Sequence, residues 1–147
     1  MSAAEPPFEL ATPHSIALEV QPADIDAYGH VNNAVYLSWC DRAAWSHSAA
    51  LGVPLARCIS LRRGMAARRI EIDYLRAARS GDRVQVATWI VSVDARWRAE
   101  RRFQIRRGDG TTLARARIDY VCINLDSGRA ARMPEEFARA YVVSVGR

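Results

Sequence analysis

The stretch PADIDAYGHVNNAVYL, Pro22–Leu37, is the most informative part of this 147-residue chain. It places two aspartates, a tyrosine, a glycine, a histidine and two asparagines directly ahead of an apolar run. Asn32 or Asn33 can cap a helix over 34–51, about five turns long, which Gly52 would end. Small or apolar side chains surround most of this helix, so we expect it to be buried on several sides. The polar loop is then either an elaborate helix cap or a catalytic loop that the helix positions.

Strand patterns lie on both sides of this helix. Apolar residues alternate with polar ones over 16–20, and almost everything after Ser60 has the β-branched and aromatic content of strands. We expect strands over 69–74, 83–93, 98–107 and 113–125, a hairpin turn at 108–110 and a short helix over 133–141. The order predicts an α+β fold in which an antiparallel sheet of about five strands, the last four in a meander, wraps around one long helix. Residues 1–14 are expected to be a loose segment, which leaves 15–147 as a single domain.

The composition excludes several classes of protein. Hydrophobic residues make up 50% of the chain and charged residues 25%, and no apolar run reaches the roughly 18 residues that a bilayer span needs. The first ten residues lack the regions of a signal peptide, so we expect a cytoplasmic protein without membrane insertion. Cys40, Cys58 and Cys122 show no CxxC spacing, and the three histidines show no metal-ligand spacing. We therefore predict reduced, mostly buried thiols and no metal.

The net charge of +5 raises the question of a nucleic-acid partner. All 21 basic residues are arginines, and they are dispersed among the strand patterns instead of being gathered on one helix. We therefore predict no nucleic-acid partner. A small ligand that carries phosphates fits the positive charge equally well.

The segment DIDAYGHVNNAVYLSWCD, residues 24–41, resembles the signature of the 4-hydroxybenzoyl-CoA thioesterase family of hotdog-fold proteins. The matching residues are Asp24, Asp26, Gly29, His30, Val31, Asn32, Asn33 and Tyr36. A weaker match covers 74–86, through Tyr74 and the Gly81-Asp82 turn, whereas Gln21 stands where many relatives carry an arginine. The resemblance covers about residues 15–140. It implies a hotdog-fold acyl-CoA thioesterase that works as a homodimer or homotetramer, with no cofactor beyond the coenzyme A of its substrate.

Thioester hydrolysis needs a nucleophile or base beside the carbonyl carbon, and hydrogen-bond donors for the developing oxyanion. A helix N-terminus supplies such donors and a positive dipole end. The resemblance favours Asp26 as the catalytic group, either attacking the carbonyl or acting as general base on water. Without the resemblance, capping of the turn would be its more common role, and that structural role is the one we expect for Asp24. His30 could support the loop or contact the substrate, through a hydrogen bond to Asp26 or to the thioester carbonyl, and Asn33 could donate from its backbone N–H.

Other residues are predicted to bind substrate. Tyr28 and Gly29 belong to the loop, and glycine lets the backbone approach the substrate closely. The arginines expected to meet the coenzyme A phosphates flank the segment between helix and strands, and they are Arg57, Arg62, Arg63 and Arg68. Asp41 lies in the helix that we expect to be buried, where a carboxylate needs a partner. It is a candidate second carboxylate of the site.

Two other functions stay open. A hydratase or dehydratase of the same fold would use an aspartate and a histidine to handle a proton and water. A non-catalytic domain would hold an acyl chain or nucleic acid without turnover. Release of free thiol from a saturated acyl-CoA distinguishes these functions, because only a thioesterase releases it.

Overall fold

The computed structural model describes residues 8–144. In chain order its elements are β1 (His14–Glu19), the 3-10 turn η1 (Pro22–Asp24), α1 (Asn33–Ala50), α2 (Leu55–Leu61), β2 (Arg63–Tyr74), β3 (Arg83–Val93), β4 (Arg98–Arg107), β5 (Thr112–Asn124) and α3 (Glu135–Ala140). The α+β class, the long central helix and the short C-terminal helix are confirmed.

The five strands form one antiparallel sheet in the order β1-β3-β4-β5-β2. The last three strands form a meander, but β2 pairs with β5 at the sheet edge, with Arg63 opposite Asn124 and Tyr74 opposite Ala114. The predicted four-strand meander is therefore wrong. Alternation identifies strands but not their partners. β2 and β3 are three strand spacings apart, or roughly 14 Å. The connection 75–82 can cross this distance, because its residues reach about 26 Å when extended.

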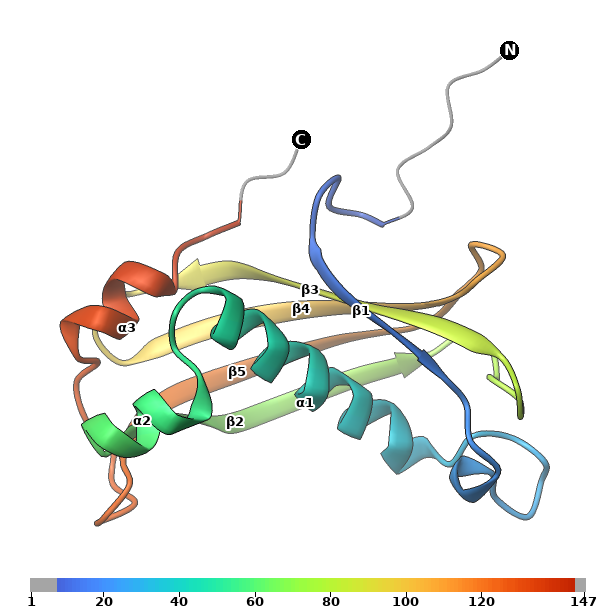
Figure 1. Ribbon diagram of the computed structural model, residues 1–147, viewed down its shortest axis with the longest axis horizontal. Coiled ribbons are helices and arrows are strands. Elements are labelled where there is room, and N and C mark those ends of the chain that lie inside the picture. Colours follow the sequence, from blue (N-terminus) through green and yellow to red (C-terminus); the bar gives the residue numbers. More distant parts are fainter. Residues whose placement is uncertain (1–7, 145–147) are drawn as a thin grey trace.

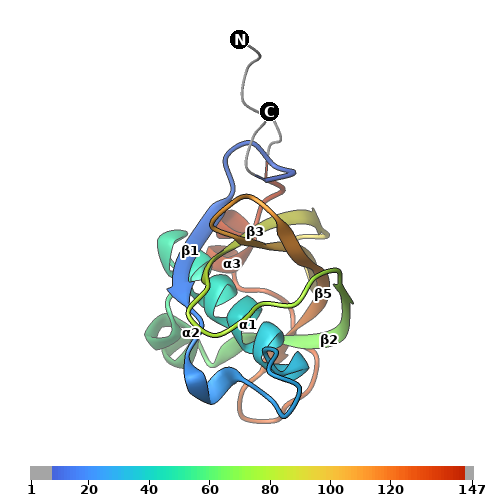
Figure 2. The same cartoon turned by 90° about the vertical axis from the view of Figure 1, so that its right-hand side faces the viewer.

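The sheet wraps around α1, which lies against its concave face (Figure 1), and Figure 2 shows the strands curving around the helix in a view along its axis. The main core joins the inner face of the sheet to buried residues of α1, among them Tyr36, Trp39, Cys40 and Ala43. Each large side chain buried there contributes about 1.5–3 kcal/mol. A stripe of α1 that includes Ser38, Asp41, Arg42, Trp45 and Ala49 is exposed. The expectation that the helix is covered on most of its circumference is therefore wrong for the single chain.

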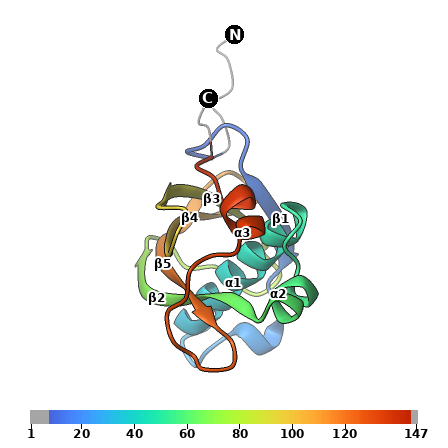
Figure 3. The ribbon, with the colours of Figure 1, turned by 90° about the vertical axis from the view of Figure 1, so that its left-hand side faces the viewer.

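The short helix α2 was not predicted. Its seven residues follow Pro54, which precedes the first residue of the helix. Figure 3 shows α2 and α3 together at the end of the sheet where α1 terminates. There Val53, Cys58, Phe137 and Tyr141 belong to a second core cluster. The two short helices thus lie near the C-terminal end of α1, whereas the polar loop precedes its N-terminus.

Part of the N-terminal segment packs against the sheet. Phe8 and Leu10 are buried, in a cluster with Ala87 and Trp89, and His14 begins β1. The expectation of a loose segment over 1–14 therefore does not hold for residues 8–14, and residues 1–7 lie outside the described part of the chain. No helix within residues 8–144 is long and apolar enough to cross a membrane.

Candidate active site

The loop ahead of α1 is closed by its own hydrogen bonds. Gln21 N–H donates to Asp24 Oδ2 at 2.9 Å, and Asn32 N–H donates to the Asp24 carbonyl at 2.8 Å. Ile25 and Val31 form an isolated antiparallel bridge that closes the base of the loop. Asp24 therefore has the structural role that was expected for it.

Asp26 lies within this closed loop. Its Oδ1 accepts hydrogen bonds from the backbone N–H of Tyr28 at 2.9 Å and of His30 at 3.4 Å. Its own N–H donates to the His30 carbonyl at 2.8 Å, and Gly29 turns the chain at φ +79°. No residue among 8–144 hydrogen-bonds Oδ2. One carboxylate oxygen thus orders the turn, and the other is available for chemistry.

The first turn of α1 offers an unpaired donor. Asn32 caps the helix, since its Oδ1 accepts from Ala34 N–H at 2.9 Å and its carbonyl accepts from Val35 N–H at 2.9 Å. The N–H of Asn33 makes no hydrogen bond within residues 8–144. An N–H at the positive end of a helix is suited to bind a developing oxyanion.

A surface pocket brings several predicted residues together. Asp26, Tyr28, His30 and Asn33 line it, and Gly29 lies in the same loop. Tyr28 is 86% exposed at the rim, and the imidazole of the half-buried His30 makes no hydrogen bond to the described chain. The pairing of the His30 side chain with Asp26, one of the two contacts considered for it, is therefore not formed.

Two further residues of this pocket were missed as site residues. Tyr74, at the end of β2, donates from its hydroxyl to the Asn33 carbonyl at 2.8 Å. Arg76 follows β2 and also lines the pocket. The weaker motif that begins at Tyr74 was the available signal, because it marks the segment that returns to the start of α1.

The predicted phosphate-binding arginines do not line this pocket. Arg57 pairs with Glu136 of α3, and Arg62, the C-cap of α2, pairs with Asp126. Both follow α1, whose 18 residues extend about 27 Å from the loop at its start. Arg63 is half-buried at the start of β2, and Arg68 is exposed further along this strand. A single chain therefore does not bring these four arginines to Asp26.

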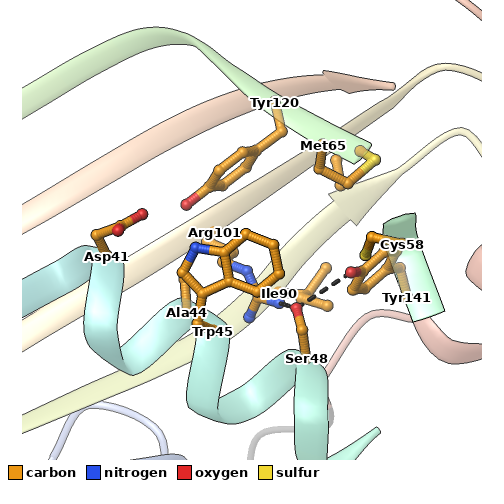
Figure 4. A pocket seen from close by; sticks show the side chains of 11 residues that line it. Asp41, Ala44, Trp45, Ser48, Cys58, Met65, Ile90, Arg101, Tyr120 and Tyr141 are labelled. Atoms are coloured by element: carbon orange, nitrogen blue, oxygen red, sulfur yellow. Dashed lines mark hydrogen bonds between the residues drawn. The ribbon is translucent and has the colours of Figure 1, made fainter. Parts of the chain in front are cut away.

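Asp41 also lies apart from Asp26. It is exposed on α1, so the expectation of a buried carboxylate that needs a partner is wrong. It lines a second pocket, between the C-terminal half of α1 and the sheet, together with Trp45, Arg101 and Tyr120 (Figure 4). The Tyr120 hydroxyl points toward Asp41 in that view. Burial, as the largest cause, raises the pKa of this phenol.

The cysteines are poor candidates for the nucleophile. All three are buried and unpaired, as predicted. Burial raises the pKa of the Cys40 thiol to about 12 and that of Cys122 to about 11, so both remain protonated at neutral pH. Within residues 8–144 no three His, Cys, Asp or Glu side chains are grouped to hold a metal ion.

Comparison with known proteins places this geometry in a family. The model of the thioesterase-like superfamily matches residues 20–141. A 1,4-dihydroxy-2-naphthoyl-CoA thioesterase from Synechocystis is 26% identical, with a TM-score of 0.79 over 88% of this chain and 96% of that one.

Two solved structures from Staphylococcus aureus share the fold at lower identity. One is a DHNA-CoA thioesterase, 18% identical with a TM-score of 0.81 over 86% of this chain and 87% of that one. The other is a hypothetical protein in complex with CoA, 20% identical with a TM-score of 0.81 over 95% and 85%. The expected class of enzyme, a thioester hydrolase, is confirmed. On the match of 20–141 and the sheet wrapped around α1, the chain belongs to the thioesterase-like superfamily and has the hotdog fold.

Proposed function

We propose that this protein is an acyl-CoA thioesterase, which hydrolyses an acyl- or aryl-CoA to the free acid and coenzyme A. One observation carries the proposal: Asp26 shares a pocket with Asn33, at the helix N-terminus. Within residues 8–144, Oδ2 of Asp26 and the N–H of Asn33 both lack a hydrogen-bond partner. The Synechocystis relative acts on a CoA thioester, which supports the same class of substrate here.

Asp26 can act by two routes. As a nucleophile, Oδ2 attacks the thioester carbonyl carbon, the C–S bond breaks, and the thiolate of coenzyme A takes a proton from solvent. Water then hydrolyses the resulting anhydride, which releases the acid and restores the carboxylate. As a general base, Asp26 takes a proton from water as this water attacks the carbonyl, and the leaving thiolate receives a proton.

The N–H of Asn33 is the proposed donor to the oxyanion in both routes. The charge that develops on the carbonyl oxygen is stabilised by this N–H and by the positive end of α1. The turn at Gly29 has open space where a Cβ would stand, so the substrate can approach the backbone there. His30 and Tyr28 line the same pocket and are proposed to contact the thioester and its carrier.

Coenzyme A brings phosphates that arginine can bind bidentately. The predicted contacts are Arg57, Arg62, Arg63 and Arg68, and the pocket itself adds Arg76. Because Arg57 and Arg62 already bind Glu136 and Asp126, a phosphate would have to compete with these carboxylates. Arg68, by contrast, lines a surface groove with Arg69 and Arg98. Replacing a true phosphate contact should raise KM and leave kcat nearly unchanged, since ground and transition states share this binding.

We also propose that the working form is a homodimer or homotetramer. β2 is a 12-residue edge strand that pairs only with β5 among the described residues. Long unpaired edges favour pairing with another chain. The exposed stripe of α1 that contains Asp41 and Trp45 offers further surface to a second copy.

The proposed reaction uses a carboxylate, a backbone donor and water, so coenzyme A enters only as part of the substrate and leaves as product. The cytoplasm is the proposed location, where acyl-CoA substrates occur and free thiols persist. The three unpaired cysteines support this location.

The test is release of free thiol from a panel of saturated aliphatic and aromatic acyl-CoA substrates, read with a thiol reagent. We expect steady-state release from at least one substrate, abolished by heat treatment of the protein. A hydratase would release no thiol from a saturated chain. A binding domain would be stabilised against heat by acyl-CoA without turnover. Either result would overturn the proposed activity.

A further inference from the structure

Arg101 is a buried cation in the core of the sheet. It lies on β4, where the strand alternation places it on the inner face with Ala99 and Phe103. The residue is only 4% exposed. Arginine is almost never fully buried unless it is paired.

The contacts of Arg101 do not neutralise its charge. Nη1 donates to His47 Nδ1 at 2.6 Å, and Nη2 donates to Ser48 Oγ at 3.1 Å. The guanidinium carbon lies 5.8 Å from the centre of the Tyr141 ring. No carboxylate within residues 8–144 forms an ion pair with Arg101.

The histidine partner is neutral. His47 accepts through Nδ1, and burial, followed by the charge of Arg101, lowers its pKa to about 4. The guanidinium has five N–H donors, of which two are used. A buried charge without a counter-charge is costly, so its retention points to a partner that residues 8–144 do not supply.

Arg101 lines the second pocket described above. Trp45, Ile90, Tyr120 and Tyr141 form its largely apolar and aromatic walls. In Figure 4, Asp41 and Tyr120 lie at one end of this pocket, whereas Ser48 and Tyr141, joined by a hydrogen bond, lie at the other.

Asp41 is not the missing counter-charge. It precedes Ser48 by seven residues, which is about two helical turns, or roughly 10 Å along α1. Its exposed side chain forms no ion pair with the described residues. A bound anion would therefore place its charge at Arg101, away from Asp41, with its apolar body against Trp45 and Tyr120.

We propose that this pocket binds a carboxylate with an apolar or aromatic body, held by the remaining N–H groups of Arg101. Arginine presents a planar fork that matches a carboxylate. The carboxylate has two candidate sources. One is the distal end of a dicarboxylic acyl group whose thioester lies at the Asp26 loop of a second copy in the proposed dimer, because about 22 Å along α1 separates Asn33 from Ser48 within one chain. The other is a free carboxylic acid. The first source rests on the proposed thioesterase function, whereas the second does not.

The first arm of the experiment measures binding alone. Benzoate and its neutral isostere benzamide are titrated while tryptophan fluorescence is read, since Trp45 lines the pocket; the Trp45→Phe variant identifies the reporter. We expect benzoate to bind at least tenfold more tightly than benzamide, because hydrogen bonds to charged groups contribute about 1.5–3 kcal/mol. Equal affinities would overturn the proposal, whether or not the protein hydrolyses thioesters.

The second arm measures turnover of 4-carboxybenzoyl-CoA against 4-carbamoylbenzoyl-CoA. A preference for the carboxylate in kcat/KM that disappears in Arg101→Met identifies the acyl group as the source. A preference in binding without one in turnover identifies a free acid. Both results support the carboxylate site.

The Arg101 variants separate a binding role from a structural one. Methionine has a similar length and removes the cost of burying an unpaired charge, so Arg101→Met should fold and lose the preference for benzoate. An Arg101→Met protein that folds and still prefers benzoate tenfold would overturn the proposal. If it does not fold, Arg101→Lys retains the charge without the fork, and an undiminished preference there would contradict a guanidinium site.

Discussion

The hydroxyl of Tyr74 donates a 2.8 Å hydrogen bond to the carbonyl oxygen of Asn33, and so joins the end of β2 to the first residue of α1. The N–H of that same residue is the proposed oxyanion donor. Tyr74 also contacts Tyr36, with ring centroids 5.2 Å apart, and Tyr36 in turn accepts a hydrogen bond from Ala78 N–H. The end of β2 and the segment after it therefore hold the start of α1 in place, which fixes the direction of the Asn33 N–H.

Tyr74→Phe should reduce kcat by about 2- to 12-fold, the range that loss of one hydrogen bond predicts. The phenyl ring keeps its contact with Tyr36, so the free energy of unfolding should fall by no more than about 1 kcal/mol. Thiol-release kinetics and urea unfolding on the same preparation measure both effects. An unchanged kcat would show that this bond does not position the oxyanion donor.

The exposed edge of β2 predicts how the protein assembles. Ile70 lies on β2 and is 41% exposed in the single chain. If β2 pairs with a second copy, Ile70→Lys should shift the protein from dimer or tetramer toward monomer in analytical ultracentrifugation, because a charge on an edge strand opposes pairing. Ile59→Lys on α2, where the isoleucine is 49% exposed, is the matched control. A wild-type protein that is already monomeric at micromolar concentration contradicts the prediction.

The histidine pair predicts a loss of stability in mild acid. His14 and His47 stack with ring centroids 5.1 Å apart, and burial and Arg101 lower the pKa of both, that of His47 to about 4. Unfolded histidine titrates near 6.5. As pH falls from 6.5 toward 4, the unfolded chain binds protons that the folded chain does not, so the free energy of unfolding falls.

For His47 alone we expect the free energy of unfolding to fall by about 1 kcal/mol between pH 7 and pH 5. This value is reduced because solvent screens the partly exposed ring. His47→Gln retains an acceptor for Arg101 and should flatten this slope. Urea unfolding at pH 5, 6 and 7 measures the effect. Carboxylates paired with arginine affect stability only below about pH 5, because arginine lowers their pKa. Arg62, for example, lowers the pKa of Asp126. Equal slopes for the variant and the parent protein would contradict the assignment.

Local patterns in the sequence predicted the elements better than their arrangement. α1 and its cap follow from Asn32 and from Gly52, and the turn at Gly110 adopts the positive φ of +96° that favours glycine. The position of β2 beside β5 was missed, because strand alternation does not encode pairing. The exposed stripe of α1 was missed because small residues such as Ala49 are compatible with burial and with exposure.

The candidate site shows the same contrast between residues that are close in sequence and residues that are distant. The loop residues Asp26, His30 and Asn33 are close in sequence and meet in one pocket. Arg101 was not identified, although the period of two along β4 places it with Phe103 on the inner face. Contacts between distant segments, such as that of Tyr74 with Asn33, depend on the pairing of strands and could not be read from the residues alone.

Asp26→Asn is the sharpest test of the mechanism. Asparagine is nearly isosteric, and its Oδ1 can accept the hydrogen bonds from Tyr28 N–H and His30 N–H that order the turn. The change removes the negative charge at the position of Oδ2, which is needed to attack the carbonyl or to take a proton from water. We expect kcat to fall by about 10²- to 10⁴-fold, with little change in the affinity for acyl-CoA. Single-turnover thiol release and calorimetric binding measure the two quantities.

The matched control is Asp24→Asn, in the same loop. Asp24 Oδ2 accepts from Gln21 N–H, and asparagine can keep this hydrogen bond but not the charge that strengthens it, so this change should lower stability by about 1 kcal/mol and leave kcat within a few-fold. A folded Asp26→Asn protein with kcat within threefold of the parent would mean that Asp26 only orders its turn. Asp41, in the second pocket, would then be the carboxylate to replace. Loss of activity in Asp41→Asn but not in Asp26→Asn would move the reaction from the helix N-terminus to the pocket that Arg101 lines.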